Sequence, residues 1–290
     1  VTGYKPSPLQ RTETVTSGQV TTGVSFILES LHVFPRGLQL MSLPWDFSHI
    51  DPAGLLGIKP GGYFGMATWE AGNNRYRVYP NAPADRFRLG TGYWLSLDTP
   101  ADLAQEGTPA PTEIELPLAA GWNLIGDPYL VGIDFYAIRV REQDGVIYPL
   151  NESMARGVLG SGLFGYMLGG YRSVAALTPY VGSGILADEP CSLVINKEMD
   201  ALAVSGAALR PAVPVPADGW LLQLRARAGG LEDTATYIGT AAGASDGLDA
   251  GLDQAKPPAP DMAPYMYVGL QQTEAGAMAV DIRGQGNRAQ

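Results

Sequence analysis

Three aspartates near the C-terminal end are the residues best suited to chemistry. Asp246, Asp249 and Asp253 occur in the glycine-containing stretch SDGLDAGLD. Closely spaced carboxylates on such a loop offer several oxygen ligands to a hard cation, so a calcium site is one interpretation, which Asp233 would join through the fold. The spacing is not that of an EF-hand, and the last glutamate of that motif is missing. The other interpretation is a set of Asx turns, in which the carboxylates accept hydrogen bonds from the loop backbone.

The sequence lacks the partner residues that nucleophilic catalysis requires, and also those of a metal site built from thiols or histidines. His32 and His49 are the only histidines, and no G-x-S-x-G elbow accompanies them. The single cysteine, Cys191, lies in the apolar run CSLVI, which is typical of a buried, inert thiol and leaves no intramolecular disulfide. We therefore expect both histidines to be structural or exposed at the surface.

Two further patterns have an ordinary structural interpretation. Residues 160–165, GSGLFG, fit G-x-G-x-x-G, but the following YMLGGYRS opposes the helix that a dinucleotide site requires, so we expect a glycine-rich β loop. The carboxylate pairs Glu113/Glu115 and Asp98/Asp102 could serve a glycosidase, but no cleft is indicated. The sequence therefore predicts that the protein is not an enzyme.

Tryptophans that alternate along β segments leave two interpretations open. Such aromatics line a sugar-binding face or, more often, fill a core. The four residues concerned are Trp45, Trp69, Trp94 and Trp122.

Composition narrows the class of protein. The formal net charge of −10 repels phosphate backbones and anionic lipid, which argues against a nucleic-acid partner and against membrane docking. No apolar run approaches the roughly 18 residues that a membrane span needs. With 46% apolar residues, 17% charged residues and 37 glycines, the 290-residue chain is expected to fold into several turn-rich domains.

An internal repeat organises the middle of the chain. GLQLMSLPW (37–45) and GWNLIGDPY (121–129) lie 84 residues apart, since 121 − 37 = 84, and each reads as a glycine turn, a short alternating strand and a proline stop. Strand patterns surround both copies, with hairpin turns at Asn73-Asn74 and Asp144-Gly145 and one helical turn at 151–156, capped by Asn151. The sequence thus predicts two tandem β modules.

The two modules resemble tandem repeats of secreted bacterial multidomain proteins, in which a strand like GWNLIGNP opens the unit and a segment like PGxGYWV closes it. Gly92-Tyr93-Trp94 matches the closing motif, whereas module B has Gly184-Ile185-Leu186 where Gly-Tyr-Trp is expected. VTSGQVTTGVSFIL (15–28) resembles the last hairpin of a carboxypeptidase-regulatory-like sandwich, and the stretch from Glu232 to Gln271 resembles the opening half of an Ig-like sandwich. The resemblance implies a secreted, extracellular or cell-surface protein.

The expected architecture is all-β. It comprises an N-terminal arm with a donor-like strand (1–30), module A (31–112), module B (113–209) and, after the Pro-rich linker RPAVPVPADG (210–219), an Ig-like β-sandwich (210–290).

The N-terminal strand has strict period-two patterning. One face carries Val20, Thr22, Val24, Phe26 and Leu28. Because the N-terminal part resembles the end of a sandwich and the C-terminal part the start of one, we expect copies of the chain to join head to tail by strand exchange through this face, as a structural homopolymer. The alternatives are that the strand packs on module A, or that the chain is a carbohydrate- or cell-surface-binding region of a larger protein.

Overall fold

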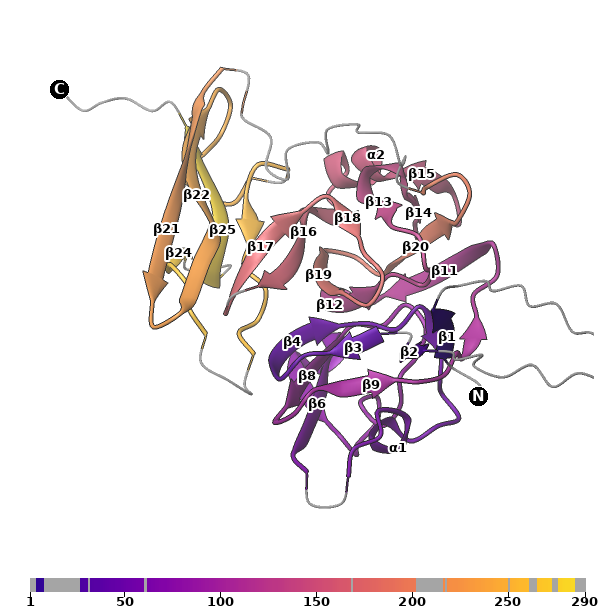
Figure 1. The fold of residues 1–290 in the computed structure, drawn as a ribbon. Coiled ribbons are helices and arrows are strands. Elements are labelled where there is room, and N and C mark those ends of the chain that lie inside the picture. The colour runs from indigo at the N-terminus through magenta and orange to yellow at the C-terminus, as the bar shows by residue number, and fades with distance from the viewer. Residues whose placement is uncertain are drawn as a thin grey trace, which may run out of the picture.

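The computed structural model describes residues 4–7, 27–30, 32–59, 62–167, 169–201, 216, 218–249, 251–260, 265–272 and 276–284. Nearly all regular structure in these ranges is β, as predicted, and the sheets are mainly antiparallel (Figure 1). The described α-helices are one turn or little more: α1 (Pro52–Leu55) in module A and α2 (Leu150–Ala155) in module B.

Module A is built around a four-stranded sheet with the order β4-β8-β6-β7. Its strands are β4 (Gly37–Met41), β8 (Tyr93–Leu97), β6 (Phe64–Glu70) and β7 (Arg75–Val78). Two short strand pairs complete the module, β3 (His32–Phe34) with β9 (Ala101–Leu103) and β5 (Trp45–Asp46) with β10 (Thr108–Pro109). Phe34, Phe47, Met66 and Tyr93 lie in the core of this module. The predicted turn at Asn73-Asn74 joins β6 to β7, and Asn74 adopts a positive φ of 48° there.

Module B repeats the order of module A as β12-β19-β16-β17. These strands are β12 (Gly121–Gly126), β19 (Gly182–Ala187), β16 (Leu159–Met167) and β17 (Gly170–Val174). A second sheet has the order β11-β20-β14-β15, formed by Glu113–Leu118, Cys191–Asn196, Arg139–Arg141 and Ile147–Pro149. The short strands β13 (Ile133–Asp134) and β18 (Ala176–Leu177) pair beside them, and the module has its own apolar core.

The register of the two sheets corrects one sequence alignment. Leu40 pairs with Trp94 in module A, and its equivalent Leu124 pairs with Gly184 in module B. The closing motif Gly92-Tyr93-Trp94 therefore corresponds to 182–184, Gly-Ser-Gly, and not to Gly184-Ile185-Leu186. Residues 182–184 form the start of β19.

Large and small side chains are exchanged between the equivalent positions of the two sheets. Module A pairs a small residue, Ala67, with the large Trp94, whereas module B pairs Phe164 with Gly184. The Trp122 ring occupies the space above Gly184 and meets Phe164 edge-on, with 5.7 Å between ring centroids. The two modules thus place their tryptophan on different strands, β8 in module A and β12 in module B. This explains why aligning the closing motif by its aromatic residues gave the wrong register.

The two modules contact each other reciprocally. Met41 forms a β-bridge with Val181, and the equivalent Ile125 forms one with Thr91. The backbone N–H of Ser42 donates to the Tyr180 carbonyl at 3.3 Å, and that of Gly126 donates to Gly90 at 3.0 Å. Such reciprocity is the contact pattern of a two-fold-related dimer, here within one chain.

Ser42 and Gly126, which are equivalent to each other, meet at the centre of this contact. A Cβ atom at Gly126 would overlap the Cβ of Ser42. The Ser42 hydroxyl donates to the carbonyl of Val181 at 3.0 Å. Glycine is required at one of the two positions because only one side chain fits between the backbones.

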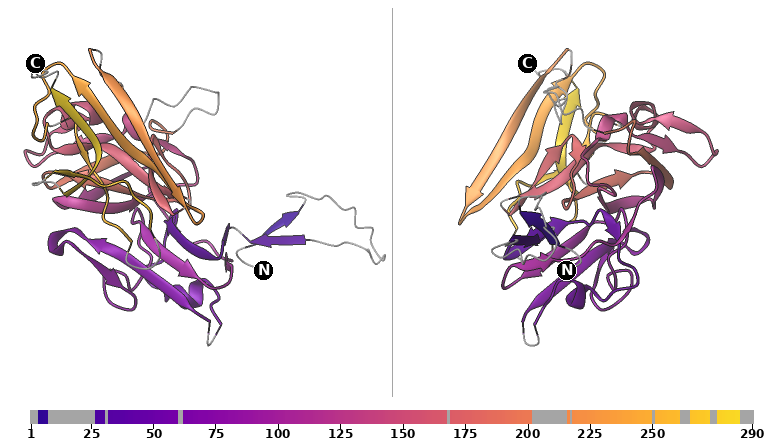
Figure 2. Two further views of the ribbon diagram at one scale, coloured as in Figure 1. Left: turned by 90° about the vertical axis from the view of Figure 1, so that its left-hand side faces the viewer. Right: turned by 45° about the vertical axis from the view of Figure 1, so that its right-hand side comes forward.

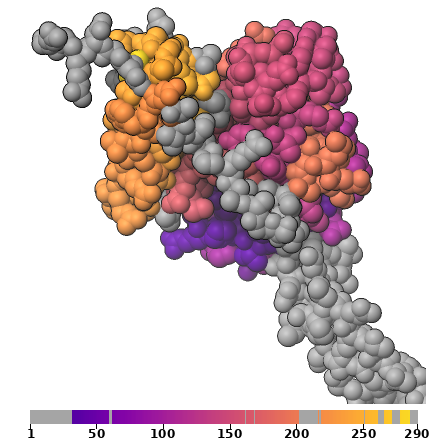
Figure 3. Space-filling model, turned by 90° about the horizontal axis from the view of Figure 1, so that it is seen from above, coloured from indigo at the N-terminus to yellow at the C-terminus, as the bar shows by residue number. Residues whose placement is uncertain are grey.

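The C-terminal segment forms a single five-stranded sheet in the described residues. Its order is β21-β22-β25-β23, with β24 also paired to β25, and β22 runs parallel to β25. The strands are Trp220–Ala228, Leu231–Ala241, Gly276–Gly284, Gln254–Ala255 and Leu270–Gln272. This sheet packs against the β12-β19-β16-β17 sheet of module B, with which it shares a buried cluster (Figure 1), and the two units are seen side by side from above in Figure 3. The Ig-like sandwich expected for residues 210–290 stays a prediction.

A shared aromatic cluster joins all three units. Trp94 of module A, Phe164 and Tyr171 of module B, and Val280 of the C-terminal sheet belong to one buried cluster. The carbonyl oxygen of Pro258 accepts hydrogen bonds from the hydroxyls of Tyr76, at 3.0 Å, and Tyr171, at 2.7 Å. The backbone that follows β23 therefore links modules A and B through these two hydrogen bonds.

The N-terminal strands form a hairpin of their own. β1 (Tyr4–Ser7) pairs antiparallel with β2 (Ile27–Ser30), and Pro6 lies opposite Leu28. The left view of Figure 2 shows this hairpin projecting from module A, well away from the C-terminal sheet. The prediction of an N-terminal β element is met at these residues, although only Leu28 of the predicted row is described.

One local prediction is wrong. Helix α2 begins at Leu150 after Pro149, and no side chain caps its first turn. Asn151 therefore lies inside the helix, because Pro149, in an extended conformation, already fixes the direction of the chain before the first turn.

Candidate functional site

The predicted aspartates lie on the loop that leads into β23. The Asp249 carboxylate accepts from the backbone N–H and the hydroxyl of Ser245, at 2.6 and 2.9 Å. Asp253 accepts from the N–H groups of Asp249 and Ile282, at 2.8 and 2.7 Å. Asp246 takes part through its backbone carbonyl, which accepts from the Arg283 guanidinium. The carboxylates of Asp249 and Asp253 satisfy backbone N–H groups, as the second interpretation expected. They accept from residues four positions earlier or from β25, however, and not from the residue two positions later that defines an Asx turn.

Asp233 is engaged elsewhere and does not join this loop. Its side chain is buried and forms an ion pair of 2.6 Å with the buried Lys256. Val268 N–H and the Thr236 hydroxyl also donate to it, at 2.6 and 3.0 Å. Among the described residues, no group of three or more His, Cys, Asp or Glu side chains is arranged to hold a metal ion. Calcium binding by Asp246, Asp249 and Asp253 stays a prediction.

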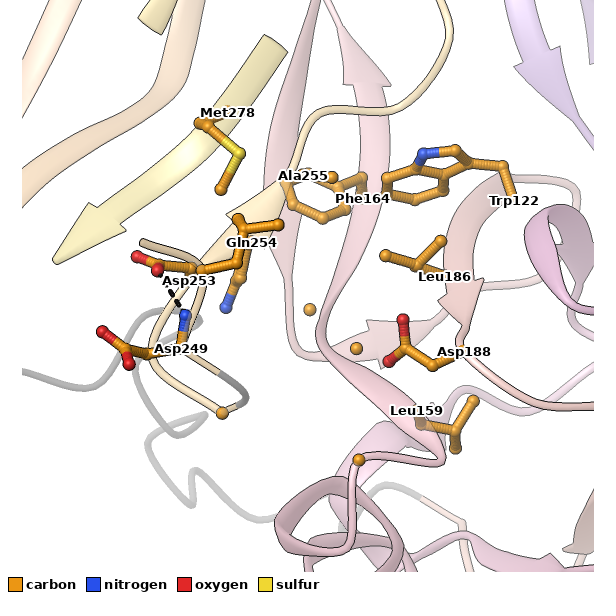
Figure 4. A pocket seen from close by; sticks show the side chains of 15 residues that line it. Trp122, Leu159, Phe164, Leu186, Asp188, Asp249, Asp253, Gln254, Ala255 and Met278 are labelled. Atoms are coloured by element: carbon orange, nitrogen blue, oxygen red, sulfur yellow. Dashed lines mark hydrogen bonds between the residues drawn. The ribbon is translucent and has the colours of Figure 1, made fainter. Parts of the chain in front are cut away.

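A cleft opens beside this loop, between the module B sheet and the C-terminal sheet (Figure 4). Its volume is about 320 Å³, at the lower end of the range of roughly 300–1,000 Å³ that is usual for small-molecule sites. Apolar side chains make up most of the wall, in particular Trp122, Leu159, Phe164, Leu186 and Met278. Glycines at 160 and 162 line the β16 side, where Leu186 packs over Gly160, and Gln254 and Phe164 pack over Gly162.

Two polar side chains face each other across the cleft. Asp188, just after β19, points its carboxylate into the cleft from module B, and Gln254 of β23 points its amide in from the opposite wall (Figure 4). No hydrogen bond to the Asp188 carboxylate forms within the described residues. Gln254 is only 7% exposed, and its Oε1 has no hydrogen-bond partner. The carboxylates of Asp249 and Asp253 point away from the cleft in the same view.

The cleft has a negative electrostatic environment. Asp188 is exposed to solvent as a residue, but partial burial of its carboxyl group and the neighbouring charge of Glu189 raise its pKa. Burial also raises the pKa of Asp253, and the carboxylates of Asp281 and Asp249 add to the effect. Lysine and arginine are absent from the cleft lining in the described part of the chain.

A second candidate site is the free edge of the C-terminal sheet. β21 pairs with β22 alone in the described structure, so its other edge has unpaired backbone groups. Trp220 and Leu222 alternate along the outer face and are 51% and 50% exposed. The left view of Figure 2 shows this broad face turned away from module B. The period-two pattern of WLLQLRARA predicts the strand, but the pattern does not show which face lacks a cover.

The predicted interface row falls mostly outside the described residues. Val20, Thr22, Val24 and Phe26 are not described. Leu28 is in β2, paired with Pro6 of β1. Strand exchange therefore stays a prediction.

The remaining chemical candidates have structural surroundings. Trp45, Trp94 and Trp122 are buried in cores, and Trp69 packs edge-on against Tyr76, so these four do not form an exposed sugar platform. His32 stacks on Tyr180, with 4.0 Å between centroids, and His49 is exposed. Burial raises the pKa of the Cys191 thiol to about 11, which keeps it protonated and unreactive at neutral pH.

The carboxylate pairs and the glycine motif are likewise structural. Glu113 pairs with Arg139 and Glu115 with Arg141, at 2.9 and 2.8 Å. Asp98 accepts from the Tyr63 N–H. Residues 160–165 lie within β16, which is followed by strand β17 rather than by a helix, so the predicted loop is in fact a strand.

Comparison with protein-family models, with curated proteins and with solved structures found no match. The resemblance to tandem modules of secreted proteins therefore remains an expectation based on the quoted motifs. None of the helices in the described ranges is long and apolar enough to cross a membrane.

Proposed function

We propose that this protein is an extracellular structural subunit, which assembles head to tail into a surface filament or layer by strand exchange. The N-terminal segment 20–28 of one copy is the donor, and the free edge of β21 in the next copy is the acceptor. The observation that carries the proposal is the exposed apolar edge of β21.

Two other sheet edges, those of β7 and β11, carry features that oppose pairing. β7 presents Arg75 and Arg77, both bonded to Glu70. β11 alternates exposed Glu113, Glu115 and Pro117 along its length. Charges and prolines on an edge are the usual protection against strand addition. The first half of β21 has neither, since Trp220 and Leu222 stand there instead.

The donor segment suits this edge in length and pattern. Residues 20–28 span nine positions, as does β21 (Trp220–Ala228). The alternating face of the donor ends in Val24, Phe26 and Leu28, which are apolar partners for the exposed side chains of β21. On this uncovered face each cross-strand apolar pair contributes roughly 0.2–1 kcal/mol, and each added ladder hydrogen bond about 1 kcal/mol.

The N-terminal hairpin is compatible with this use. β2 has β1 on one edge only, so the other edge of β2 is free in the described structure. Because the hairpin projects from the body at a distance from the C-terminal sheet (Figure 2), a donor on it would reach a neighbouring copy more readily than its own β21. A contact between different surfaces of successive copies does not close on itself and makes a filament. The extracellular location rests on the motif resemblance.

The test uses two variants, each disabling one side of the contact. Leu222→Lys places a charge on the acceptor, and Phe26→Lys places one on the donor. Each variant alone should remain monomeric in light scattering, while the unaltered chain forms filaments visible by electron microscopy. Mixed in equal amounts, the two should form a discrete heterodimer, because one intact donor then meets one intact acceptor and both outer ends are blocked.

The matched control is Val146→Lys, which charges an equally exposed apolar residue, 48% exposed, away from β21. It should assemble like the unaltered chain. The proposal is wrong if the unaltered chain stays monomeric at high concentration. It is also wrong if either single variant forms filaments. Removing residues 1–28 should also leave soluble monomers.

A further inference from the structure

We propose that the cleft between module B and the C-terminal sheet binds a small organic ammonium ion with an apolar body. The ammonium group bonds to Asp188, while the apolar part lies against Leu159, Leu186 and Phe164. This binding goes beyond the assembly function and uses none of the residues of β21 or the N-terminal segment.

The shape of the cleft selects a small ligand with an apolar body. Its volume of about 320 Å³ accommodates a molecule of the size of an amino acid or an aromatic amine. The walls near β16 and β19 are aliphatic and aromatic. A highly polar or extended ligand would leave these walls uncovered.

The polar groups of the cleft select the charge of that ligand. Asp188 points a carboxylate into the cleft without any hydrogen-bond donor from the described residues. An ammonium group supplies up to three donors and no acceptor, and such charge-assisted bonds are roughly twice as strong as neutral ones. Asp249, Asp253 and Glu189 nearby add negative charge that no lining lysine or arginine offsets.

Gln254 is the second, independent indication of a ligand. Its side chain is more than nine-tenths buried, yet it points into the cleft, and its Oε1 lacks a partner (Figure 4). A buried polar group without a partner is costly, on the order of 1–3 kcal/mol. Rotation of the amide about its last bond presents either the acceptor Oε1 or the donor Nε2 to a ligand. The Oε1 lies against Gly162 and is shielded from solvent, so a bound ammonium compound would supply the missing donor once the amide turns its oxygen toward the cleft.

The experiment compares three probes that share one apolar body. Phenethylammonium, phenethyl alcohol and phenylacetate differ in charge at the same position. We expect phenethylammonium to bind saturably and to shift the backbone amide signals of Gly160 and Gly162 in NMR spectra. The alcohol should bind about tenfold more weakly, which is the effect of losing one charge-assisted bond. Phenylacetate should not bind.

Two variants locate the charge effect. Asp188→Asn should weaken phenethylammonium binding by about tenfold and leave the alcohol nearly unchanged. Glu198→Gln removes one exposed carboxylate that does not line the cleft, and should leave both affinities unchanged. Circular dichroism checks that both variants are folded.

Three outcomes would overturn the proposal. Equal binding of the ammonium compound and the alcohol would make the cleft a purely apolar site. Equal effects of the two variants would show that only overall charge matters. If no probe at millimolar concentration shifts the signals of Gly160 and Gly162, the cleft is not a binding site for this class of ligand.

Discussion

Two fully buried aspartates of this protein have very different surroundings. Asp233 is paired with Lys256 and receives further donors from Ala235, Thr236 and Val268. Asp127 receives a single hydrogen bond, from the Tyr129 N–H at 2.9 Å, and its second oxygen has no partner. Burial consequently raises the pKa of Asp127 to about 7. Removing either partner of the Asp233–Lys256 pair would leave a buried charge uncompensated.

The raised pKa of Asp127 makes stability depend on pH. Between about pH 4 and pH 7 the folded chain binds a proton at Asp127 that the unfolded chain does not, so the free energy of unfolding falls as the pH rises through this window. The full effect is on the order of 4 kcal/mol. Asp127→Asn should therefore stabilise the protein at pH 8 and change little at pH 4, as measured by urea unfolding.

The control for this prediction is Glu198→Gln, which neutralises an exposed carboxylate. It should leave the pH profile of unfolding unchanged. A loss of stability in Asp127→Asn at pH 8 would mean that the charged carboxylate has an unrecognised stabilising partner.

Individual residues also explain why the two copies of the repeat could be aligned only in part from the sequence. The glycine and proline landmarks of 37–45 and 121–129 align, and so do their strands. The aromatic residues do not, because Trp94 faces a small residue in module A, whereas in module B the Trp122 ring covers Gly184 from another strand. The two modules fill the same space in the sheet with a large side chain, but the tryptophan that does so comes from a different position in each.

At the scale of elements, strands and hairpin turns could largely be predicted and the contacts between sheets could not. Alternation identified β4, β12 and β21, and Asp144-Gly145 identified the turn between β14 and β15, where Gly145 has a φ of 82°. β17 and β19 were missed because paired or repeated glycines favour a turn assignment. In β17 and β19 these glycines permit close backbone approach instead: Gly170 meets Glu232, and Gly182 meets Met41.

The cleft could not be predicted because its residues are far apart in the sequence. Asp188 and Gln254 carry no motif, and only the packing of β23 against module B brings them to opposite walls. By contrast, Asp249 and Asp253 attracted attention through their spacing, which serves the local backbone. Short-range patterns identify loops, whereas a site between sheets depends on long-range contacts.

The contact between Ser42 and Gly126 gives a prediction at the scale of elements. Gly126→Ala should destabilise the protein by roughly 1–3 kcal/mol, because the new methyl group would overlap the Ser42 side chain and push β4 and β12 apart. Ser42→Gly combined with Gly126→Ala should recover much of this loss, since the small residue then lies on the other side. Chemical unfolding of the two single variants and the double variant measures the coupling.

Gly72→Ala is the matched control for this cycle, because a Cβ there meets no atom within 4 Å. It should be close to neutral. Additive effects of Ser42→Gly and Gly126→Ala would contradict a direct contact between the two residues.

At the scale of the whole molecule, the net charge of −10 bears on the proposed assembly. Copies of an acidic subunit repel one another, whereas the proposed contact is an apolar strand on an apolar edge. Salt screens the repulsion over a Debye length, about 10 Å at 0.1 M, and leaves apolar burial intact. The critical concentration for assembly should therefore fall between low and physiological salt, as measured by sedimentation of the polymer.

Glu198→Gln again offers a comparison, since reducing the charge of each copy by one should lower the critical concentration slightly at low salt. An assembly that dissolves as salt increases would indicate a contact made by ion pairs, in conflict with the proposed acceptor edge.

The carbonyl oxygen of Pro258 binds one tyrosine hydroxyl from module A and one from module B, while its own backbone belongs to the C-terminal unit. The same three units share a buried aromatic cluster, so we expect that unfolding any one of them exposes aromatic surface of the other two. Heating should produce one calorimetric transition whose van't Hoff and calorimetric enthalpies agree, even though the chain comprises three units with separate sheets. A subunit built in this way resists partial unfolding. A filament of such subunits would therefore dissociate at the contacts between subunits before any subunit unfolded.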